Sequence, residues 1–485
     1  MPLENKADGR WLALLILCAG FLMIVLDMTI VNVALPSIKI DLGFSQAGLA
    51  WVVNAYLIAY AGLLLLAGRL GDLIGRKRIF LIGLVMFTAA SVLCGLSISQ
   101  PMLIAARFLQ GIGGAVSSAV ILGMVVMMFP EPAERARAIG VFSFVASAGA
   151  SIGLLAGGII TQAVSWHWIF FVNLPIGVVI AVLAARLLAS DRGLGLDEGA
   201  DILGALLVTA GLMLGVYAIV QSADYGLVST HTLGFGAVAV ILLAAFAIRQ
   251  AKGRNPLLPL RLFLVPNVSV ANVIQALGGV AMFGFFFFSS LYMQRVLGYG
   301  PLTIGLAFLP VAVLMGTLSI AVTDRLIMRF GARKVLLVGF ALISVALLLA
   351  ARGPVSGDYL RDWFPVMALL GIGGGLAFPS LAVVAMAGAS PSDAGLASGL
   401  LNTTGQVGAA LGLAVLATVS TNRSSALMAQ GHGLVAALSE GYHLAWAVGA
   451  GLAIASIVIA ATLLKSNTTG NGDGAIEEEE EEASA

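Results

Sequence analysis

Long apolar runs separated by short polar or charged segments make up most of this chain of 485 residues. A helix needs about 20 mostly apolar residues to cross the hydrocarbon core of a bilayer. About fourteen runs reach that length. The first eight cover roughly 11–36, 48–70, 79–99, 102–129, 138–164, 168–189, 202–221 and 233–251. The other six cover roughly 268–293, 301–323, 334–352, 363–388, 394–420 and 441–465. The pattern predicts an all-α polytopic membrane protein with 14 transmembrane helices.

The chain also repeats itself at a nearly constant spacing. Five features recur in chain order 256 to 260 residues later: Gly75 and Gly331, Gly111 and Gly371, Pro132 and Pro391, Gly149 and Gly408, Gly153 and Gly412. We therefore expect two six-helix halves, 11–189 and 268–465, separated at 190–267 by two inserted helices and a surface-lying linker. Parallel repeats of this kind are typical of alternating-access transporters, whose substrate site lies near the midplane between the halves.

Composition narrows the function further. Hydrophobic residues make up 60% of the chain and charged residues 10%, whereas soluble domains carry about 25% charged residues. A net charge of +1 offers no basic field for nucleic acid, and a soluble enzyme is excluded. Cys18 and Cys94 lie in apolar runs and no histidine has a partner at metal-ligand spacing, so no metal site or cofactor is expected. The chain lacks a phosphate-binding G-x-x-x-x-G-K-[ST] loop, so a proton gradient rather than ATP is the expected energy source.

The distribution of basic residues predicts the orientation. With the N-terminus inside, nineteen Lys and Arg residues fall in cytoplasmic segments and five in the opposite loops, as the positive-inside rule requires. We expect a monomer in the plasma (inner) membrane with both termini cytoplasmic. We expect residues 1–10 to form a cytoplasmic N-terminus and residues 466–485 to form a disordered acidic tail.

Two ionisable residues, Asp27 and Arg107, lie well inside apolar runs. A charge at that depth is expensive and is a functional hypothesis by default. A carboxylate that alternates between protonation and pairing with arginine could couple proton flow to substrate movement, because pairing favours its charged form and desolvation its neutral form. The alternative is a static ion pair that only fixes helix packing.

The segment GRLGDLIGRKRIF (68–80) joins the second and third runs on the expected cytoplasmic side. Gly68 and Gly75 allow close helix approach and a tight turn, and Asp72 and Arg76 are four residues apart on one helical face. These four residues are candidate gating residues, whose contacts would close one side of a transporter. The alternative is a basic loop that only sets topology. The equivalent acidic position in the second half is Met328, so gating is expected to be asymmetric.

Four signatures resemble those of a known family. GRLGDLIGRKR is similar to the loop signature of the major facilitator superfamily. LDMTIVNVALPSI (26–38), RFLQGIGGA (107–115) and WHWIFFVNLPIG (166–177) resemble its fourteen-span drug:proton antiporter family. The resemblance implies proton coupling at Asp27, with Arg107 and Gln110 lining the cavity nearby. It also implies a gate at Asp72 and Arg76, with Asp72 meeting the start of the thirteenth span near Asp393.

One signature departs from that family. Its antiporter motif in the fifth span has the form G-P-x-x-G-G, and this chain reads Gly-Leu-Leu-Ala-Gly-Gly at 153–158. Gly149, Gly153, Gly157 and Gly158 still permit close helix packing, but Leu154 removes the proline kink. The change leaves import open as an alternative to export.

Candidate substrate contacts come from both halves. The segment MFGFFFFSSLYMQ (282–294) places Phe285, Phe286 and Phe287 opposite Asp27 in the repeat, with some of the four consecutive phenylalanines facing lipid. Asn32, Asn402 and Gln406 are polar candidates for the same cavity. An aromatic wall facing one acid suits amphipathic or cationic compounds.

The sequence thus predicts an exporter of small amphipathic or drug-like compounds in exchange for protons. The alternatives are a dedicated exporter or importer of one endogenous metabolite and a non-transporting membrane sensor. A sensor would need a large soluble module to pass its signal on.

Overall fold

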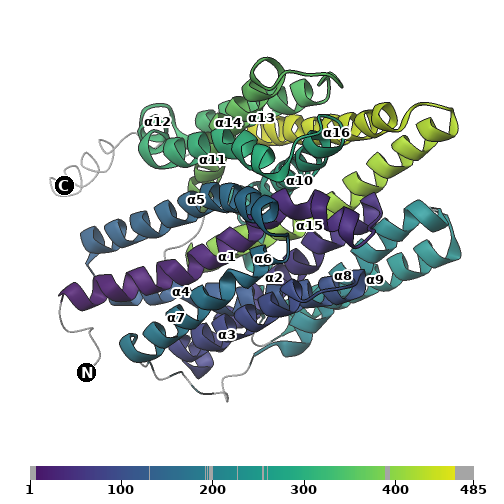
Figure 1. The fold of residues 1–485 in the computed structure, drawn as a ribbon. Helices are drawn as coiled ribbons and strands as arrows, with labels where there is room; N and C mark the ends of the chain where they lie inside the picture. The colour runs from purple at the N-terminus through teal and green to yellow at the C-terminus, as the bar shows by residue number, and fades with distance from the viewer. Residues whose placement is uncertain are drawn as a thin grey trace.

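The computed structural model describes residues 7–464 apart from 130, 190, 192, 194, 196–199, 227, 254–255, 259 and 388–393. All regular structure in this part of the chain is helical (Figure 1). Thirteen described helices are long and apolar enough to cross a membrane, and α5 adds a shorter apolar segment, Ile152–Ala163. The predicted all-α polytopic fold is therefore confirmed.

The first half contains seven helices because the sixth span is made of two. They are α1 (Ala7–Asp41), α2 (Gln46–Ile74), α3 (Arg76–Gly95), α4 (Gln100–Met128), α5 (Pro132–Ala163), α6 (Trp168–Phe171) and α7 (Asn173–Leu187). Local signals mark their ends. The Ser45 side chain accepts a hydrogen bond from the Gly48 amide at the start of α2, as an N-cap does. Pro101 and Pro132 lie in the first turns of α4 and α5, where a missing amide costs least.

Two inserted helices, α8 (Ile202–Tyr225) and α9 (Thr230–Lys252), follow, and the short 3₁₀ helix η3 (Leu260–Leu264) lies in the linker. The second half contains α10 (Pro266–Arg295), α11 (Pro301–Ala321), α12 (Thr323–Phe330), α13 (Ala332–Ala350), the π turn η4 (Tyr359–Trp363), α14 (Phe364–Ala387), α15 (Ala394–Ala429) and α16 (Leu434–Leu463). Helix α8 packs against α2 of the first half and α15 of the second.

Glycines at equivalent repeat positions make equivalent contacts. Gly75 and Gly331 have φ of +112° and +83° at the turns before α3 and α13, a backbone region that favours glycine. A Cβ on Gly153 would lie 2.0 Å from Thr29 Oγ1 of α1, and one on Gly412 would lie 2.2 Å from Val280 of α10. The repeat therefore reproduces the same close packing between the first and fifth spans of each half.

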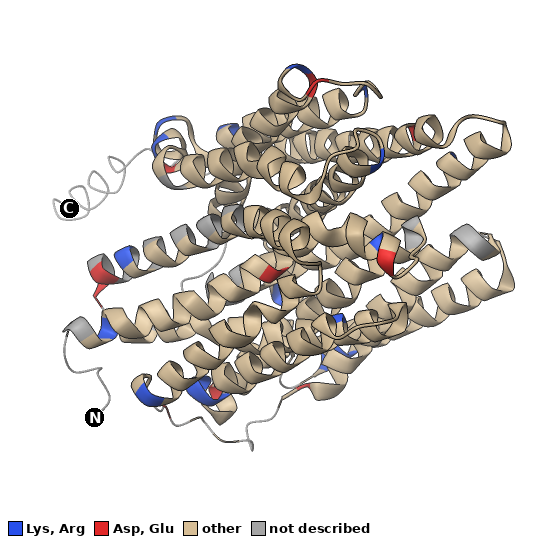
Figure 2. Cartoon of the chain, in the orientation of Figure 1, with Lys and Arg blue, Asp and Glu red and all other residues tan. Residues whose placement is uncertain are grey.

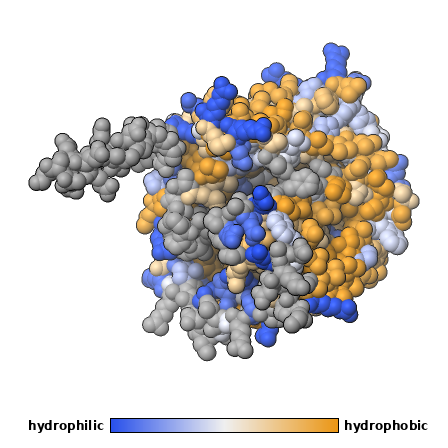
Figure 3. Space-filling view, turned by 90° about the vertical axis from the view of Figure 1, so that its left-hand side faces the viewer, coloured by the Kyte–Doolittle hydropathy of each residue, from blue (hydrophilic) through white to orange (hydrophobic). Residues whose placement is uncertain are grey.

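Both described chain ends lie at one end of the bundle, which we call the terminal end. At this end Arg10 near the start of α1 pairs with Glu134 near the start of α5 at 3.3 Å. Arg333 at the start of α13 donates a hydrogen bond to the Ala460 carbonyl near the end of α16 at 3.3 Å. Most coloured, charged positions lie near the two ends of the helices, whose middles are largely uncharged (Figure 2). The terminal end presents clustered hydrophilic side chains beside an apolar flank (Figure 3).

The two halves contact each other tightly near the opposite end of the bundle. The Gln162 side chain near the end of α5 accepts a hydrogen bond from the Leu302 amide of α11 at 3.0 Å. Ser290 Oγ of α10 donates to the Asn32 carbonyl of α1 at 2.6 Å. A Cβ on Gly158 would lie 2.7 Å from the Pro301 carbonyl. The absence of a side chain at Gly158 thus allows α5 and α11 to come into contact.

We expect Gly158→Val to separate α5 from α11 by about 1–2 Å, because the added carbons meet backbone that cannot rotate away. Spin labels at Ala163 and Thr303, both exposed, should report a larger population of long distances. Gly236→Val on α9 is the matched control, since a Cβ at Gly236 has nothing within 4 Å. An unchanged distance distribution in Gly158→Val would show that this glycine does not set the closure.

Candidate functional site

The two intramembrane charges pair directly inside the first half. Arg107 Nη1 of α4 lies 2.5 Å from Asp27 Oδ2 of α1, and their side chains are 2% and 0% exposed. The other carboxylate oxygen accepts hydrogen bonds from Gln110 Nε2 at 2.7 Å and Asn173 Nδ2 at 3.2 Å. Asn173 Nδ2 also donates to Ser91 Oγ at 2.9 Å. We call Asp27, Arg107, Gln110, Asn173 and Ser91 the buried polar network.

Arg107 makes further contacts through its guanidinium group. Arg107 Nε donates to the Val52 carbonyl at 3.0 Å, and Nη1 also donates to Gln110 Oε1 at 2.7 Å. The guanidinium lies 4.4 Å above the ring of Tyr56. Desolvating two charges is costly unless the pair is well aligned and its other polar atoms have partners. Here the pair is direct and both carboxylate oxygens have donors, and the contacts link α1, α2, α3, α4 and α7.

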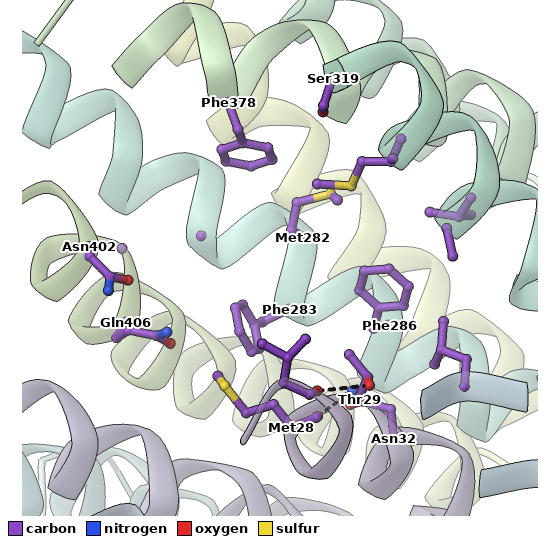
Figure 4. Close-up of a pocket in the computed structure, with 18 of the residues that line it drawn as sticks. Met28, Thr29, Asn32, Met282, Phe283, Phe286, Ser319, Phe378, Asn402 and Gln406 are labelled. Atoms are coloured by element: carbon purple, nitrogen blue, oxygen red, sulfur yellow. Dashed lines mark hydrogen bonds between the residues drawn. The ribbon is translucent and has the colours of Figure 1, made fainter. Parts of the chain in front are cut away.

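A cavity of about 410 Å³ lies between the halves (Figure 4). Met28, Thr29 and Asn32 of α1 face it from the first half. Met282, Phe283 and Phe286 of α10, Ser319 of α11, Phe378 of α14, and Asn402 and Gln406 of α15 face it from the second half (Figure 4). Four of the predicted cavity residues, Asn32, Phe286, Asn402 and Gln406, are therefore on its wall. Sequence reasoning missed Phe283, Met282 and Gln275, because periodicity alone does not show which side of a buried helix faces a cavity.

The buried polar network lies on the other side of α1 from this cavity. The cavity-lining stripe of α1 is Val25, Met28, Thr29 and Asn32, and at 100° per residue Asp27 points away from that stripe. Arg107 and Gln110, which the family resemblance placed on the cavity wall, are instead 2% and 0% exposed beside Asp27. That expectation is corrected: these residues hold the carboxylate and do not line the described cavity.

The phenylalanine run is also corrected in part. Only Phe286 of the three candidates lines the cavity, and Phe285 and Phe287 are 1% and 0% exposed within the protein core. Phe287 packs edge-on against Phe288. The expectation that part of this run faces lipid is wrong for Phe285, Phe287 and Phe288, because neighbouring helices surround α10 on most sides.

The candidate gating residues lie at the terminal end. Arg76 Nη2 contacts Asp72 Oδ1 at 2.8 Å, as the four-residue spacing predicts. Gly68, Asp72 and Arg76 line a larger cavity of about 1270 Å³. Asn402 lines both this cavity and the one between the halves. The predicted contact of Asp72 near Asp393 falls outside the described residues, as does the acidic tail.

Asp191 is a further residue at this turn that sequence reasoning did not select. Its carboxylate accepts hydrogen bonds from the Arg76 amide at 2.7 Å and the Lys77 amide at 3.2 Å. An acidic side chain at a helix N-terminus satisfies unpaired amides and opposes the positive end of the helix dipole. A Cβ on Gly75 would lie 2.9 Å from the Asp191 carbonyl. Gly75 therefore makes room for the segment after α7 that caps α3.

Comparison with known proteins assigns this architecture. Two helical halves with a central cavity between them are typical of alternating-access transporters. The family model of the Major Facilitator Superfamily matches residues 17–413. The chain therefore belongs to the major facilitator superfamily, and it is a multi-pass membrane transporter of that family.

Several antibiotic exporters and resistance proteins are similar over most of the chain. The puromycin resistance protein of Streptomyces alboniger is 36% identical, covering 96% of this chain and 95% of that one. The cephamycin export protein CmcT of Amycolatopsis lactamdurans is 39% identical, covering 87% of each chain. The tetracenomycin C resistance and export protein of Streptomyces glaucescens is 34% identical, covering 87% of this chain and 78% of that one. In fold, a bacterial homolog of the human lysosomal transporter Spinster has a TM-score of 0.67 at 17% identity, covering 96% of this chain and all of that one.

We expect Arg107→Met to lower the free energy of unfolding by about 3–5 kcal/mol, because it leaves a buried carboxylate without its counter-charge. Arg10→Met, which breaks a half-exposed pair, should cost under about 1 kcal/mol. Thermal unfolding in detergent checks both. Equal losses in the two variants would mean that the Asp27 pair contributes no more than a surface pair.

Proposed function

We propose that this protein exports small amphipathic, drug-like compounds across the plasma membrane in exchange for protons, by alternating access. The observation that carries the proposal is the juxtaposition of a buried carboxylate–arginine pair and a central cavity on opposite faces of α1. A proton that binds Asp27 would weaken its pairing with Arg107, and α1 would carry that change to the cavity wall. The similarity to the antibiotic exporters named above supports small drug-like compounds as substrates.

The terminal end is proposed to be cytoplasmic, in keeping with the distribution of basic residues. The larger cavity between α2, α4 and α9 opens the protein at that end, and the contacts of Gly158, Gln162 and Ser290 hold the opposite end closed. In this arrangement a compound reaches Asn402 from the terminal end and passes to the central cavity.

Import of a metabolite is the alternative raised by Leu154. The contacts of its neighbours favour export. Cβ atoms on Gly153 and Gly157 would lie 3.0 Å from the Leu26 carbonyl and 2.8 Å from the Ile30 carbonyl of α1. The close packing of α5 on α1 that the proline motif is associated with is therefore present with leucine at this position.

The proton coupling is tested by Asp27→Asn, whose amide cannot bind or release a proton. In proteoliposomes that trap a pH-sensitive dye, addition of tetracenomycin C should move protons with the native protein and not with the variant. Exchange of labelled compound without a gradient should continue in the variant. Asp324→Asn on α12, an exposed position, is the matched control and should retain proton movement. Gradient-driven transport by Asp27→Asn would exclude Asp27 as the coupling group.

The gate is tested by Asp72→Asn, which weakens the contact with Arg76. A gate contact changes the rate of switching between states more than affinity at the central cavity. We expect turnover to slow about tenfold, equivalent to ~1.4 kcal/mol, with the dissociation constant nearly unchanged. Measuring equilibrium binding and the transport rate on one preparation separates an effect on turnover from an effect on affinity. Loss of binding in proportion to transport would contradict the gating role.

A further inference from the structure

We infer that the central cavity selects uncharged aromatic compounds that carry a hydrogen-bond donor, and that it discriminates against organic cations and anions. The inference rests on the proposed function for the site but names its substrate class. It replaces the expectation of cationic substrates that an acid facing an aromatic wall suggested.

The described lining of the cavity contains no charged side chain. Its polar groups are amides and hydroxyls, among them Asn32, Gln275, Ser319, Asn402 and Gln406. The apolar part consists mainly of thioethers and phenyl rings, including Met282, Phe283, Phe286 and Phe378 (Figure 4). Such a wall matches aromatic surface and offers hydrogen bonds, without a counter-charge for an ion.

The nearest intramembrane charges do not supply one either. Asp27 is 0% exposed and its oxygens already accept from Arg107, Gln110 and Asn173. Rotating this carboxylate toward the cavity would leave Arg107 buried without its partner, which is strongly unfavourable. Asp27 is therefore held away from the cavity and cannot neutralise a bound cation.

An ion entering this cavity would lose its hydration without compensation. Phenyl faces attract cations, yet that attraction offsets only part of the desolvation of a full charge. An uncharged compound avoids this cost and gains from burial of its rings. The preference for uncharged compounds thus follows from the absence of a charged side chain in the described cavity wall.

The donor requirement comes from one atom. Gln406 Oε1 is buried and has no hydrogen-bond partner in the structure, and its side chain reaches the cavity from α15 (Figure 4). A buried acceptor without a partner is unfavourable. Rotation of the terminal amide, whose χ3 torsion has a broad range, would turn Oε1 toward a bound hydroxyl or N–H group. Two other polar groups of the wall have their donors engaged: the Thr29 hydroxyl and the Asn32 amide donate to the carbonyls of Val25 and Met28.

Three phenyl-rich probes of similar size separate charge from shape: triphenylmethanol, which is neutral and has one O–H donor, tetraphenylphosphonium, which is cationic, and triphenylacetate, which is anionic. Equilibrium binding of each labelled probe to the purified full-length protein in detergent needs no gradient. We expect triphenylmethanol to bind at least about tenfold more tightly than either ion. Equal or tighter binding of tetraphenylphosphonium would overturn the inference.

Two substitutions test the assignment to Gln406. Gln406→Glu, assayed at pH 9 so that the carboxyl is ionised, should raise tetraphenylphosphonium affinity about tenfold and lower triphenylacetate affinity. Gln406→Leu removes the acceptor and should weaken triphenylmethanol several-fold. Gln430→Glu adds the same charge at an exposed position after α15 and should change neither. An unaltered order of affinities in Gln406→Glu would show that the cavity wall does not set charge preference.

These results are independent of the proton-coupling test. If triphenylmethanol binds preferentially and Asp27→Asn still transports against a gradient, the substrate class stands and the proposed coupling fails. If proton coupling depends on Asp27 while the phosphonium binds as tightly as the alcohol, the coupling stands and the inference fails.

Discussion

The ion pair between Asp27 and Arg107 is the constraint on which the first half of the molecule depends. Two charges removed from water and lipid are tolerated only when every remaining polar atom around them is satisfied. That condition fixes the rotations of α1 and α4 about their axes and requires the amides of Gln110 and Asn173 at the carboxylate. It also places Ser91 of α3 behind Asn173. The network therefore determines which face α1 can present to the cavity.

Placing the carboxylate and the substrate on opposite faces of one helix has a mechanistic consequence. A proton and a compound that competed for one carboxylate would be coupled by direct displacement. In the proposed mechanism the two events would be separated by the width of α1, so coupling would require α1 to move or rotate. The Ser290 hydroxyl of α10 holds the Asn32 carbonyl of α1, which gives such a movement a direct effect on the contact between the halves.

Much of the architecture could be predicted because it depends on length, hydropathy and glycine spacing. The span pattern and the repeat follow from bilayer thickness and from contacts that only glycine allows, as at Gly153 and Gly412. The pairing of Asp27 with Arg107 was also predictable, since an isolated charge at that depth would be unstable. The face of α10 that points to the cavity was not predictable, because four consecutive phenylalanines (285–288) cover every side of the helix. Their hydrophobicity does not distinguish Phe286 on the cavity wall from Phe285 and Phe287 in the core.

Contacts between segments that are distant in sequence could not be predicted from the sequence either. Asp191 lies more than a hundred residues from the amides that it caps, and no local pattern marks it. Asn173 lies within the segment WHWIFFVNLPIG (166–177). Its isolated position among apolar residues was a signal that could have identified it. Long-range polar pairings of this kind depend on tertiary packing, which a single sequence does not specify.

The second half preserves the glycine packing of the first half but not its buried ion pair. Its glycines keep the packing of α10 on α15, but the positions that correspond to Arg107 fall at Val366 and Met367, both buried. Instead of an ion pair, the interior near η4 holds aromatic rings, with Tyr292 5.0 Å from Trp363 and 5.4 Å from Trp446 between ring centroids. Packed rings have no group that a proton could neutralise, whereas the first half has the carboxylate of Asp27. Under the proposed function the first half is thus the part that would respond to protons, and the second half supplies most of the cavity wall.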